Sequence, residues 1–307
     1  MSAHGLHHVT AYSGPARRNL DFYRRVLGLR LVKKTVNFDD PGTYHLYYGD
    51  ETGSPGTILT FFPIEQAAQG RLGTGETQET AFTVPRASIA AWMDRFAAHN
   101  VAFETPVQRF GETVLRFADP DGMALALVGI DEAGEAMSSN GEVSTEHAIR
   151  GFHGVTLRLA EPGPTAAILT DVLGFDELAR EGAFVRFGSG AKLGGLVTIE
   201  AVGRAERGRP GAGSVHHIAF RAADDAEQEA MVARLRQRHG LVATEQRDRN
   251  YFRSVYFREP GGVLFEIATD IPGFAVDEPD GLGESLKLPP GLEAHRARIE
   301  AALPPLD

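Results

Sequence analysis

Two pairs of adjacent histidines are the residues of this sequence most suited to chemistry. His7 and His8 lie in the segment GLHHVTAYSG, and His216 and His217 lie in SVHHIAF, far along the chain. Both segments have the apolar, β-branched composition of a strand. Neighbouring strand residues point to opposite faces, so one imidazole of each pair faces a given side. A single strand histidine more often belongs to a packed core, but the repetition of the pair favours metal ligands.

A single carboxylate, Glu266, lies in the otherwise apolar segment GVLFEIA, between Phe265 and Ile267. A charged side chain is costly in such a strand unless it is paired or bound to a metal. A buried salt bridge with Arg253 or Arg258 is the alternative. Two histidines and one carboxylate form the facial triad that suits non-haem Fe(II) and leaves positions open for substrate and dioxygen. We therefore predict that His8, His217 and Glu266 hold Fe(II).

Composition narrows the class of protein. The chain has 307 residues, of which 42% are hydrophobic and 23% charged, enough for two domains. The formal net charge of -10 argues against nucleic-acid binding. The absence of cysteine excludes thiolate metal sites and disulfides. No apolar run predicts a membrane span, and the N-terminus lacks the pattern of a secretory signal, so we expect a cytoplasmic protein.

The elements that must position these side chains repeat four times along the chain. Each copy has the order strand, helix, then about three strands, of which the last is apolar. The opening strands are expected at 5–13, 79–85, 151–161 and 214–222, and the helices at 16–29, 86–100, 164–175 and 225–240. The turns FADPDGMALAL and FREPGGVLFEI match position by position and predict equivalent hairpins in copies two and four.

The repeat predicts a division of the chain. We expect an N-terminal double unit at 1–130, a polar linker at 131–150, a C-terminal double unit at 151–270, and a Pro/Gly-rich tail at 271–307 that ends in one short helix and wraps the body.

Alignment of the copies gives each histidine a column. GLHHVT aligns with GFHGVT, so His153 corresponds to His7 and Gly154 corresponds to His8. The position of Glu266 is Thr60 in copy one and Ala126 in copy two. His8 and Glu266 can therefore meet His217 only if copies one and four pack together. His153 is expected to be structural or to lie beside the site. No chemistry is assigned to His45, His99, His147, His239 and His295.

The four βαβββ copies resemble the vicinal oxygen chelate superfamily, and more narrowly its hydroquinone ring-cleaving dioxygenases. The resemblance runs nearly end to end, through LHHVTAYSG, LVKKTVNFDDPGTYHLYYGDETGSPGTILTFFP, EHAIRGFHGVTLRL, HHIAF, DRNYFRSVYFREPGGVLFEIATD and the tail segments GFAVDE and LGESLKLPP. It implies an α+β fold of four βαβββ modules that form two domains of curved mixed sheets. It also implies a small aromatic diol and O2 as substrates, and no partner of nucleic acid or membrane; a homo-oligomer stays open.

The resemblance also implies roles for individual residues. His8, His217 and Glu266 would bind Fe(II), with Mn(II) as the alternative. Tyr256 would be a hydrogen-bond donor near the bound phenolate, and His7 and Arg249 would be the histidine and arginine beside the metal centre. His7 can reach the face of His8 only if a bulge distorts the strand; otherwise it supports the opposite face, and both alternatives stay open.

The predicted reaction is insertion of both atoms of dioxygen into an aromatic ring. Two other functions use the same scaffold. A glyoxalase-like isomerase or lyase has a carboxylate ligand from each paired copy, and Thr60 at that position argues against it. A non-catalytic protein that binds an aromatic compound has no need of an open redox metal site.

Overall fold

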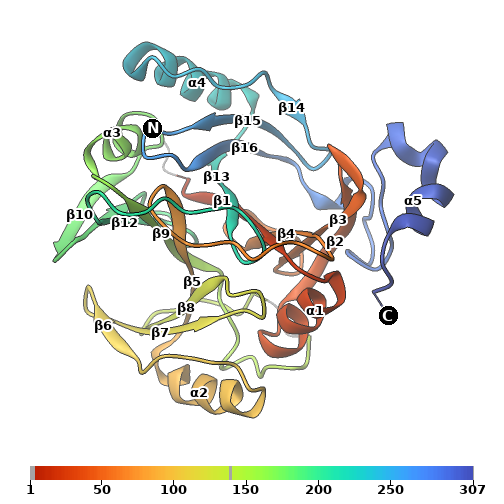
Figure 1. Cartoon of the computed structure of the whole chain (residues 1–307), viewed down its shortest axis with the longest axis horizontal. Helices are drawn as coiled ribbons and strands as arrows, with labels where there is room; N and C mark the ends of the chain where they lie inside the picture. Colours follow the sequence, from red (N-terminus) through yellow and green to blue (C-terminus); the bar gives the residue numbers. More distant parts are fainter. Residues whose placement is uncertain (1–3, 138–139, 307) are drawn as a thin grey trace.

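The computed structural model describes residues 4–137 and 140–306 and contains four βαβββ units (Figure 1). The units cover residues 6–63, 76–130, 152–201 and 215–272, and we call them units one to four. Their strands form two curved mixed sheets with few helices, which confirms the predicted α+β class.

The first half of the chain contains units one and two. Unit one comprises β1 (Leu6–Ser13), α1 (Ala16–Asp21), η1 (Phe22–Val26), β2 (Arg30–Asn37), β3 (Asp40–Gly49) and β4 (Ile58–Pro63). Unit two comprises β5 (Glu76–Pro85), η2 (Arg86–Ser88), α2 (Ile89–Ala98), β6 (Val107–Arg109), β7 (Glu112–Ala118) and β8 (Ala124–Ile130).

The second half contains units three and four and the tail. Unit three comprises β9 (Phe152–Leu159), α3 (Gly163–Asp171), β10 (Asp176–Glu181), β11 (Phe184–Gly188) and β12 (Leu196–Ala201). Unit four comprises β13 (Val215–Ala222), α4 (Asp225–His239), β14 (Arg247–Asp248), β15 (Phe252–Arg258) and β16 (Leu264–Pro272). The tail adds η3 (Phe274–Val276), η4 (Pro290–His295) and α5 (Arg296–Ala302), so it carries the predicted short helix near its end.

Each sheet joins one unit from each half of the chain. The first sheet has the strand order β14-β15-β16-β13-β1-β4-β3-β2, and the second has the order β10-β11-β12-β9-β5-β8-β7-β6. Units one and four meet at the antiparallel pair β1–β13, and units two and three meet at the antiparallel pair β5–β9. The packing of copy one against copy four, which the proposed ligands require, is therefore confirmed. The boundaries at residues 130, 150 and 270 stay a prediction about how the chain is organised.

Two carboxylates tie consecutive units together. Tyr23 from the helical segment of unit one donates to Asp119 in the hairpin turn of unit two, with a distance of 2.9 Å. Thr165 of α3 in unit three donates in the same way to Glu259 in the turn of unit four. Both carboxylates also accept backbone N–H groups of their own turns. These bonds satisfy groups that would otherwise be buried without partners.

The structure differs from the predicted elements in three places. The helix expected at 16–29 is α-helical only over Ala16–Asp21 and continues as a π-helix over Phe22–Val26. The segment VAFETPVQRF predicts a strand over 101–110, but the structure has a strand only over Val107–Arg109. The structure also adds β10, whose side chains are largely exposed, because its pairing with β11 rather than an apolar face defines it. The described helices include none long and apolar enough to cross a bilayer.

The tail is fixed to unit one through a buried cation. Lys33 of β2 is fully buried, and its Nζ lies 2.8 Å from a carboxylate oxygen of Asp277 and 2.8 Å from one of Glu278. Two acidic partners offset the cost of burying the ammonium group. These ion pairs hold the tail against unit one. Figure 1 shows α5 beside β2 and β3.

Candidate metal centre

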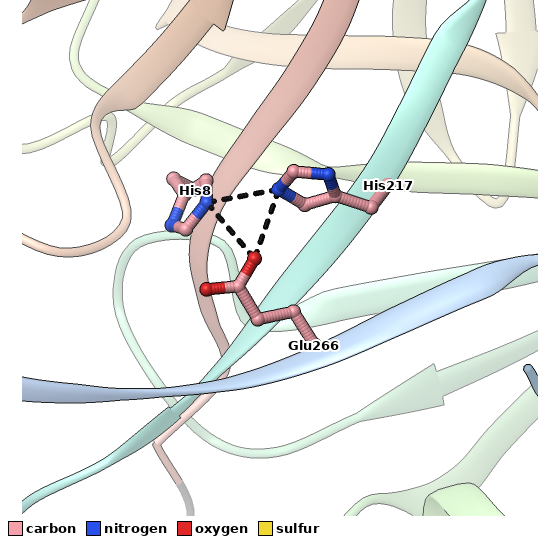
Figure 2. Close-up of side chains that lie close together, drawn as sticks. All are labelled: His8, His217 and Glu266. Atoms are coloured by element: carbon pink, nitrogen blue, oxygen red, sulfur yellow. Dashed lines mark hydrogen bonds and ion pairs between the residues drawn. The ribbon is translucent and has the colours of Figure 1, made fainter. Parts of the chain in front are cut away.

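His8, His217 and Glu266 converge from three adjacent strands of the first sheet (Figure 2). Nε2 of His8 lies 3.3 Å from Nε2 of His217, and Oε2 of Glu266 lies 2.9 Å from the latter and 3.5 Å from the former. All three side chains are buried. The strand order β16-β13-β1 places them side by side, because β13 pairs with both of its neighbours.

One carboxylate oxygen of this cluster accepts no hydrogen bond. Oε1 of Glu266 accepts the hydroxyl proton of Ser254, but Oε2, although close to both imidazoles, has no hydrogen-bond partner within the described part of the chain. A buried, unsatisfied carboxylate oxygen is costly. Two ring nitrogens and this oxygen form the donor set that a divalent transition metal takes. The residues present therefore fit a metal ion.

Each ligand histidine is held from behind by the histidine that precedes it. Nδ1 of His7 lies 2.9 Å from Nδ1 of His8, and Nδ1 of His216 lies 2.8 Å from Nδ1 of His217. If Nε2 of each ligand presents its lone pair to a metal, Nδ1 must carry the proton and donate it to the preceding ring. This contact fixes the tautomer and orientation of a metal-binding imidazole.

The strand β1 is irregular where His7 occurs. Its pairing with β13 shifts register between Leu6 and His8. The distortion that would bring His7 to the side of His8 is therefore present, and the ring of His7 lies 5.1 Å from that of His8. His7 does not, however, line the pocket described below. It contacts His8 and packs beside Phe252.

The surroundings set the protonation states of the cluster. Burial alone would raise the pKa of Glu266, but His8 and His217 outweigh it and hold that pKa well below its usual range. Burial lowers the pKa of His217, against the opposing attraction of Glu266. Burial also lowers the pKa of His216 to about 3, with a further contribution from His217. An ionised carboxylate and neutral imidazoles are the forms that bind a metal.

Two members of the cluster, His8 and His217, line a pocket of about 260 Å³ in the first sheet. We call this cavity the first pocket. Its volume suits a single aromatic ring with small substituents. The lining residues are His8, Tyr12, Asn37, Phe38, Asp39, His45, Tyr47, Phe62, His216, His217, Arg249, Phe252 and Tyr256.

Tyr256 and Arg249 lie in this pocket, as the sequence predicts. Arg249 donates from Nε to the hydroxyl oxygen of Tyr256 at 3.2 Å and from Nη2 to Asp39 at 3.1 Å. Burial raises the pKa of Tyr256, which the nearby Arg249 only partly opposes, so the hydroxyl keeps its proton. Because its oxygen already accepts from Arg249, that proton is free to point into the pocket.

His45 is a pocket residue to which the sequence assigned no chemistry. Its Nε2 lies 2.7 Å from the hydroxyl of Thr60, and its Nδ1 lies 2.8 Å from the hydroxyl of Tyr47. Burial, and then the charges of His8 and His217, lower its pKa well below the usual range. The period-two alternation of His45 and Tyr47 in YHLYY was the available signal, because both then share a face with Thr60.

The structure places His153 away from the first pocket. It lies on β9 in the second sheet, where its Nε2 is 3.1 Å from Oε1 of Glu112. Glu112 also pairs with Arg186 at 2.6 Å. His153 therefore takes part in a three-residue ion-pair network that joins β7, β9 and β11.

Known proteins resemble this chain over its whole length. The family model described as "Glyoxalase/Bleomycin resistance protein/Dioxygenase superfamily" matches residues 5–127 and 151–267. The Bacillus subtilis protein named "Putative ring-cleaving dioxygenase MhqO" is 47% identical over 99% of this chain and 96% of its own length. A "Chlorohydroquinone/hydroquinone 1,2-dioxygenase" of Sphingobium indicum is 34% identical over 94% of this chain and 92% of its own length.

A solved structure has the same fold. The crystal structure of a "putative dioxygenase" from Bacillus subtilis superimposes with a TM-score of 0.95 at 47% identity, covering 100% of this chain and 98% of the other.

Proposed function

This chain belongs to the Glyoxalase/Bleomycin resistance protein/Dioxygenase superfamily, and from that membership we propose that it is an Fe(II)-dependent, extradiol-type ring-cleaving dioxygenase that acts on a hydroquinone. The observation that carries the proposal is the convergence of two imidazoles and one carboxylate, with both imidazoles lining the first pocket. The relatives named for ring cleavage and for hydroquinone support the reaction and the substrate class. Mn(II) is the alternative metal.

His8, His217 and Glu266 would hold the metal through Nε2, Nε2 and Oε2. A bound ferrous ion would pass electrons from the ring to dioxygen and would supply open coordination positions and a lowered pKa for a phenol. The protein's own contribution is to exclude water and hold the ring. Phe252 packs beside His8, with 5.0 Å between the ring centroids, and Phe62 packs beside His45 at 4.3 Å. These aromatic walls suit a flat apolar ring.

Tyr256 and Arg249 would direct the substrate's oxygen atoms. The hydroxyl of Tyr256 faces the pocket as a donor, and the guanidinium of Arg249 fixes it from behind. A donor placed beside a developing oxyanion stabilises that charge. Tyr256 would also return a proton when the ring opens, since it stays protonated at neutral pH.

The first test is oxygen consumption by the protein loaded with Fe(II) under anaerobic conditions. With methylhydroquinone as the substrate, we expect oxygen uptake equimolar with ring loss. Formation of lactoylglutathione from the hemithioacetal of methylglyoxal would instead favour a glyoxalase-like isomerase. Binding of methylhydroquinone without turnover would favour a non-catalytic binding protein. Either of these two results would contradict the proposal.

The register argues against the glyoxalase-like alternative. Glu266 pairs across from Ala219 in unit four, and the corresponding pair in unit one is Thr60 with Thr10. Thr60 therefore occupies the position of a second carboxylate ligand. Its hydroxyl contacts His45 and donates to Thr10 at 2.9 Å, so it belongs to a hydrogen-bonded wall.

A further inference from the structure

A second pocket of about 560 Å³ occupies the second sheet at the positions that form the first pocket in the other sheet. The strand registers prove the correspondence. His8 pairs with Ala219, and Gly154 pairs with Ala81. Glu266 lies opposite Ala219 and Tyr256, and Ala126 lies opposite Ala81 and Arg116.

The second sheet lacks the set of two imidazoles and one carboxylate found in the first. Gly154, Glu79 and Ala126 take the places of His8, His217 and Glu266. A side chain at Gly154 is excluded on steric grounds, because its Cβ would lie 2.2 Å from the carbonyl oxygen of Leu196. The backbone at Gly154 is closely packed against β12, and Gly154 does not line the second pocket.

Its lining has gained arginines instead. Arg109 occupies the position of Arg249. Arg109 pairs with Glu112, three residues further on, and Arg249 likewise donates its backbone N–H to the carbonyl of Phe252, three residues further on. Arg116 replaces Tyr256. Arg158 replaces Tyr12, because each lies four residues after the His8 position. The aromatic walls are Phe103, Phe117 and Phe184.

These arginines have more donors than partners. Arg109 is only 8% exposed. Its Nη1 lies 3.4 Å from Oε1 of Glu79, which is a long hydrogen bond, and its guanidinium lies 4.3 Å from the centre of the Phe184 ring. Arg116 uses Nε for Glu79 at 2.9 Å. Arg158 has two long contacts, to Gln78 at 3.4 Å and to Glu200 at 3.8 Å.

Buried guanidinium groups need hydrogen-bond acceptors, and each of them carries five N–H donors. Arg109 is buried and Arg116 and Arg158 are partly exposed, and three guanidinium groups on one cavity with aromatic rings between them match a planar molecule that bears a carboxylate. Three carboxylates share the cavity with the arginines. Glu79 is engaged by Arg109 and Arg116, Glu104 at the rim is 66% exposed, and Glu200 lies 3.8 Å from Arg158.

From this arrangement we infer that the second pocket binds a flat aromatic or unsaturated organic carboxylate, with Arg109, Arg116 and Arg158 on the carboxylate and Phe184 against the planar body. The site is separate from the proposed metal centre. The side chains of the second sheet determine which ligand it binds. The inference goes beyond the proposed function and does not depend on it.

Calorimetric titration of the full chain with cinnamate tests the inference, with cinnamamide as the neutral probe of equal shape. We expect saturable binding of cinnamate at one site per chain, weakened by salt, and no comparable binding of the amide. Arg109→Gln and, separately, Arg158→Gln should each weaken binding about tenfold or more, the effect of losing a hydrogen bond to a charged group. Arg158 is partly exposed, so its variant folds even if Arg109→Gln does not.

The matched control is Arg249→Gln, the equivalent change in the first pocket. It should leave the affinity for cinnamate unchanged. If Arg249→Gln abolishes binding while Arg158→Gln and Arg109→Gln retain it, the acid binds in the first pocket and the inference is wrong. Equal binding of cinnamate and cinnamamide, or no saturable binding of either, would also overturn it.

Discussion

Glu266 carries the only negative charge among the three proposed ligands, and its replacement by glutamine is the most direct test of the metal centre. Glutamine keeps the size of the side chain and can still accept from Ser254. The variant should fold normally but lose iron, with activity down by about a hundredfold or more, since even residues that only support a ligand alter metal affinity 10–100-fold. Iron content per chain and circular dichroism measure the two effects.

His153→Ala is the matched control for that variant. His153 occupies the column of His7 in the repeat but lies in the second sheet, bonded to Glu112. We expect it to retain its iron and most of its activity. Normal turnover by Glu266→Gln, or loss of iron from His153→Ala, would show that the ligands have been assigned to the wrong sheet.

Tyr256 is a residue whose hydroxyl alone can be tested. Tyr256→Phe preserves the ring beside His217, at 5.7 Å between centroids, and removes the hydroxyl that accepts from Arg249. We expect kcat to fall by roughly 10²–10⁴, the usual contribution of a positioned proton donor, while iron content stays unchanged. A fall in iron content, or an unchanged kcat, would assign the hydroxyl to packing.

At the scale of the strands and helices, the repeat predicted most of what the structure contains. The helix α4 follows an Asp224 N-cap and ends at Gly240 in the left-handed conformation, both of which are local signals. The π-helix over Phe22–Val26 and the register shift at Leu6–His8 were beyond reach. Both features depend on how a segment packs against distant partners. A register shift between two paired strands leaves the period-two hydrophobic pattern in the sequence of each strand unchanged.

The same reasoning explains which site residues could be found. His8 and His217 share a column of the repeat, and Glu266 is the lone carboxylate of its own column, so comparison within the chain singled them out. His45 became a pocket residue only through the pairing of β3 with β4, which places it near Thr60. The contact of Arg249 with Asp39 likewise joins loops of units four and one that no local pattern connects.

The ion-pair network of Glu112 makes the second sheet sensitive to acid. Burial would raise the pKa of Glu112, but His153 and Arg186 outweigh it and lower that pKa to about 2. The folded state therefore holds the carboxylate ionised where the unfolded chain, with a pKa near 4.5, takes up a proton. The stabilisation is present above pH 4.5 and is lost as the pH falls toward 2.

Glu112→Gln should reproduce that loss at neutral pH. We expect the variant to be less stable by on the order of 1–3 kcal/mol at pH 7, and the difference from the parent protein to shrink between pH 4.5 and 2. Urea unfolding of both proteins across this pH range measures it. A difference that stays constant with pH would mean that the carboxylate contributes packing rather than charge.

At the scale of the whole molecule, the proposed metal would hold the two ends of the sequence together. His8 lies in unit one and His217 and Glu266 lie in unit four, and these units pair through β1 and β13 of the first sheet. A ligand that binds the folded chain and not the unfolded one stabilises it by about 2.7 kcal/mol at a free concentration of 100 times Kd. Removal of the metal by a chelator should therefore lower the unfolding temperature, by roughly 5 °C.

The dependence on the ligand set makes this prediction specific. Restoring Fe(II) without oxygen should return the unfolding temperature to its original value. In Glu266→Gln the chelator should leave that temperature unchanged, because this variant keeps the β1–β13 pair but lacks the carboxylate ligand. Calorimetric scans of both proteins, with and without chelator, give the comparison. An equal response of the two proteins to the chelator would place the stabilising metal elsewhere, because only a site that includes Glu266 links metal loss to the β1–β13 junction.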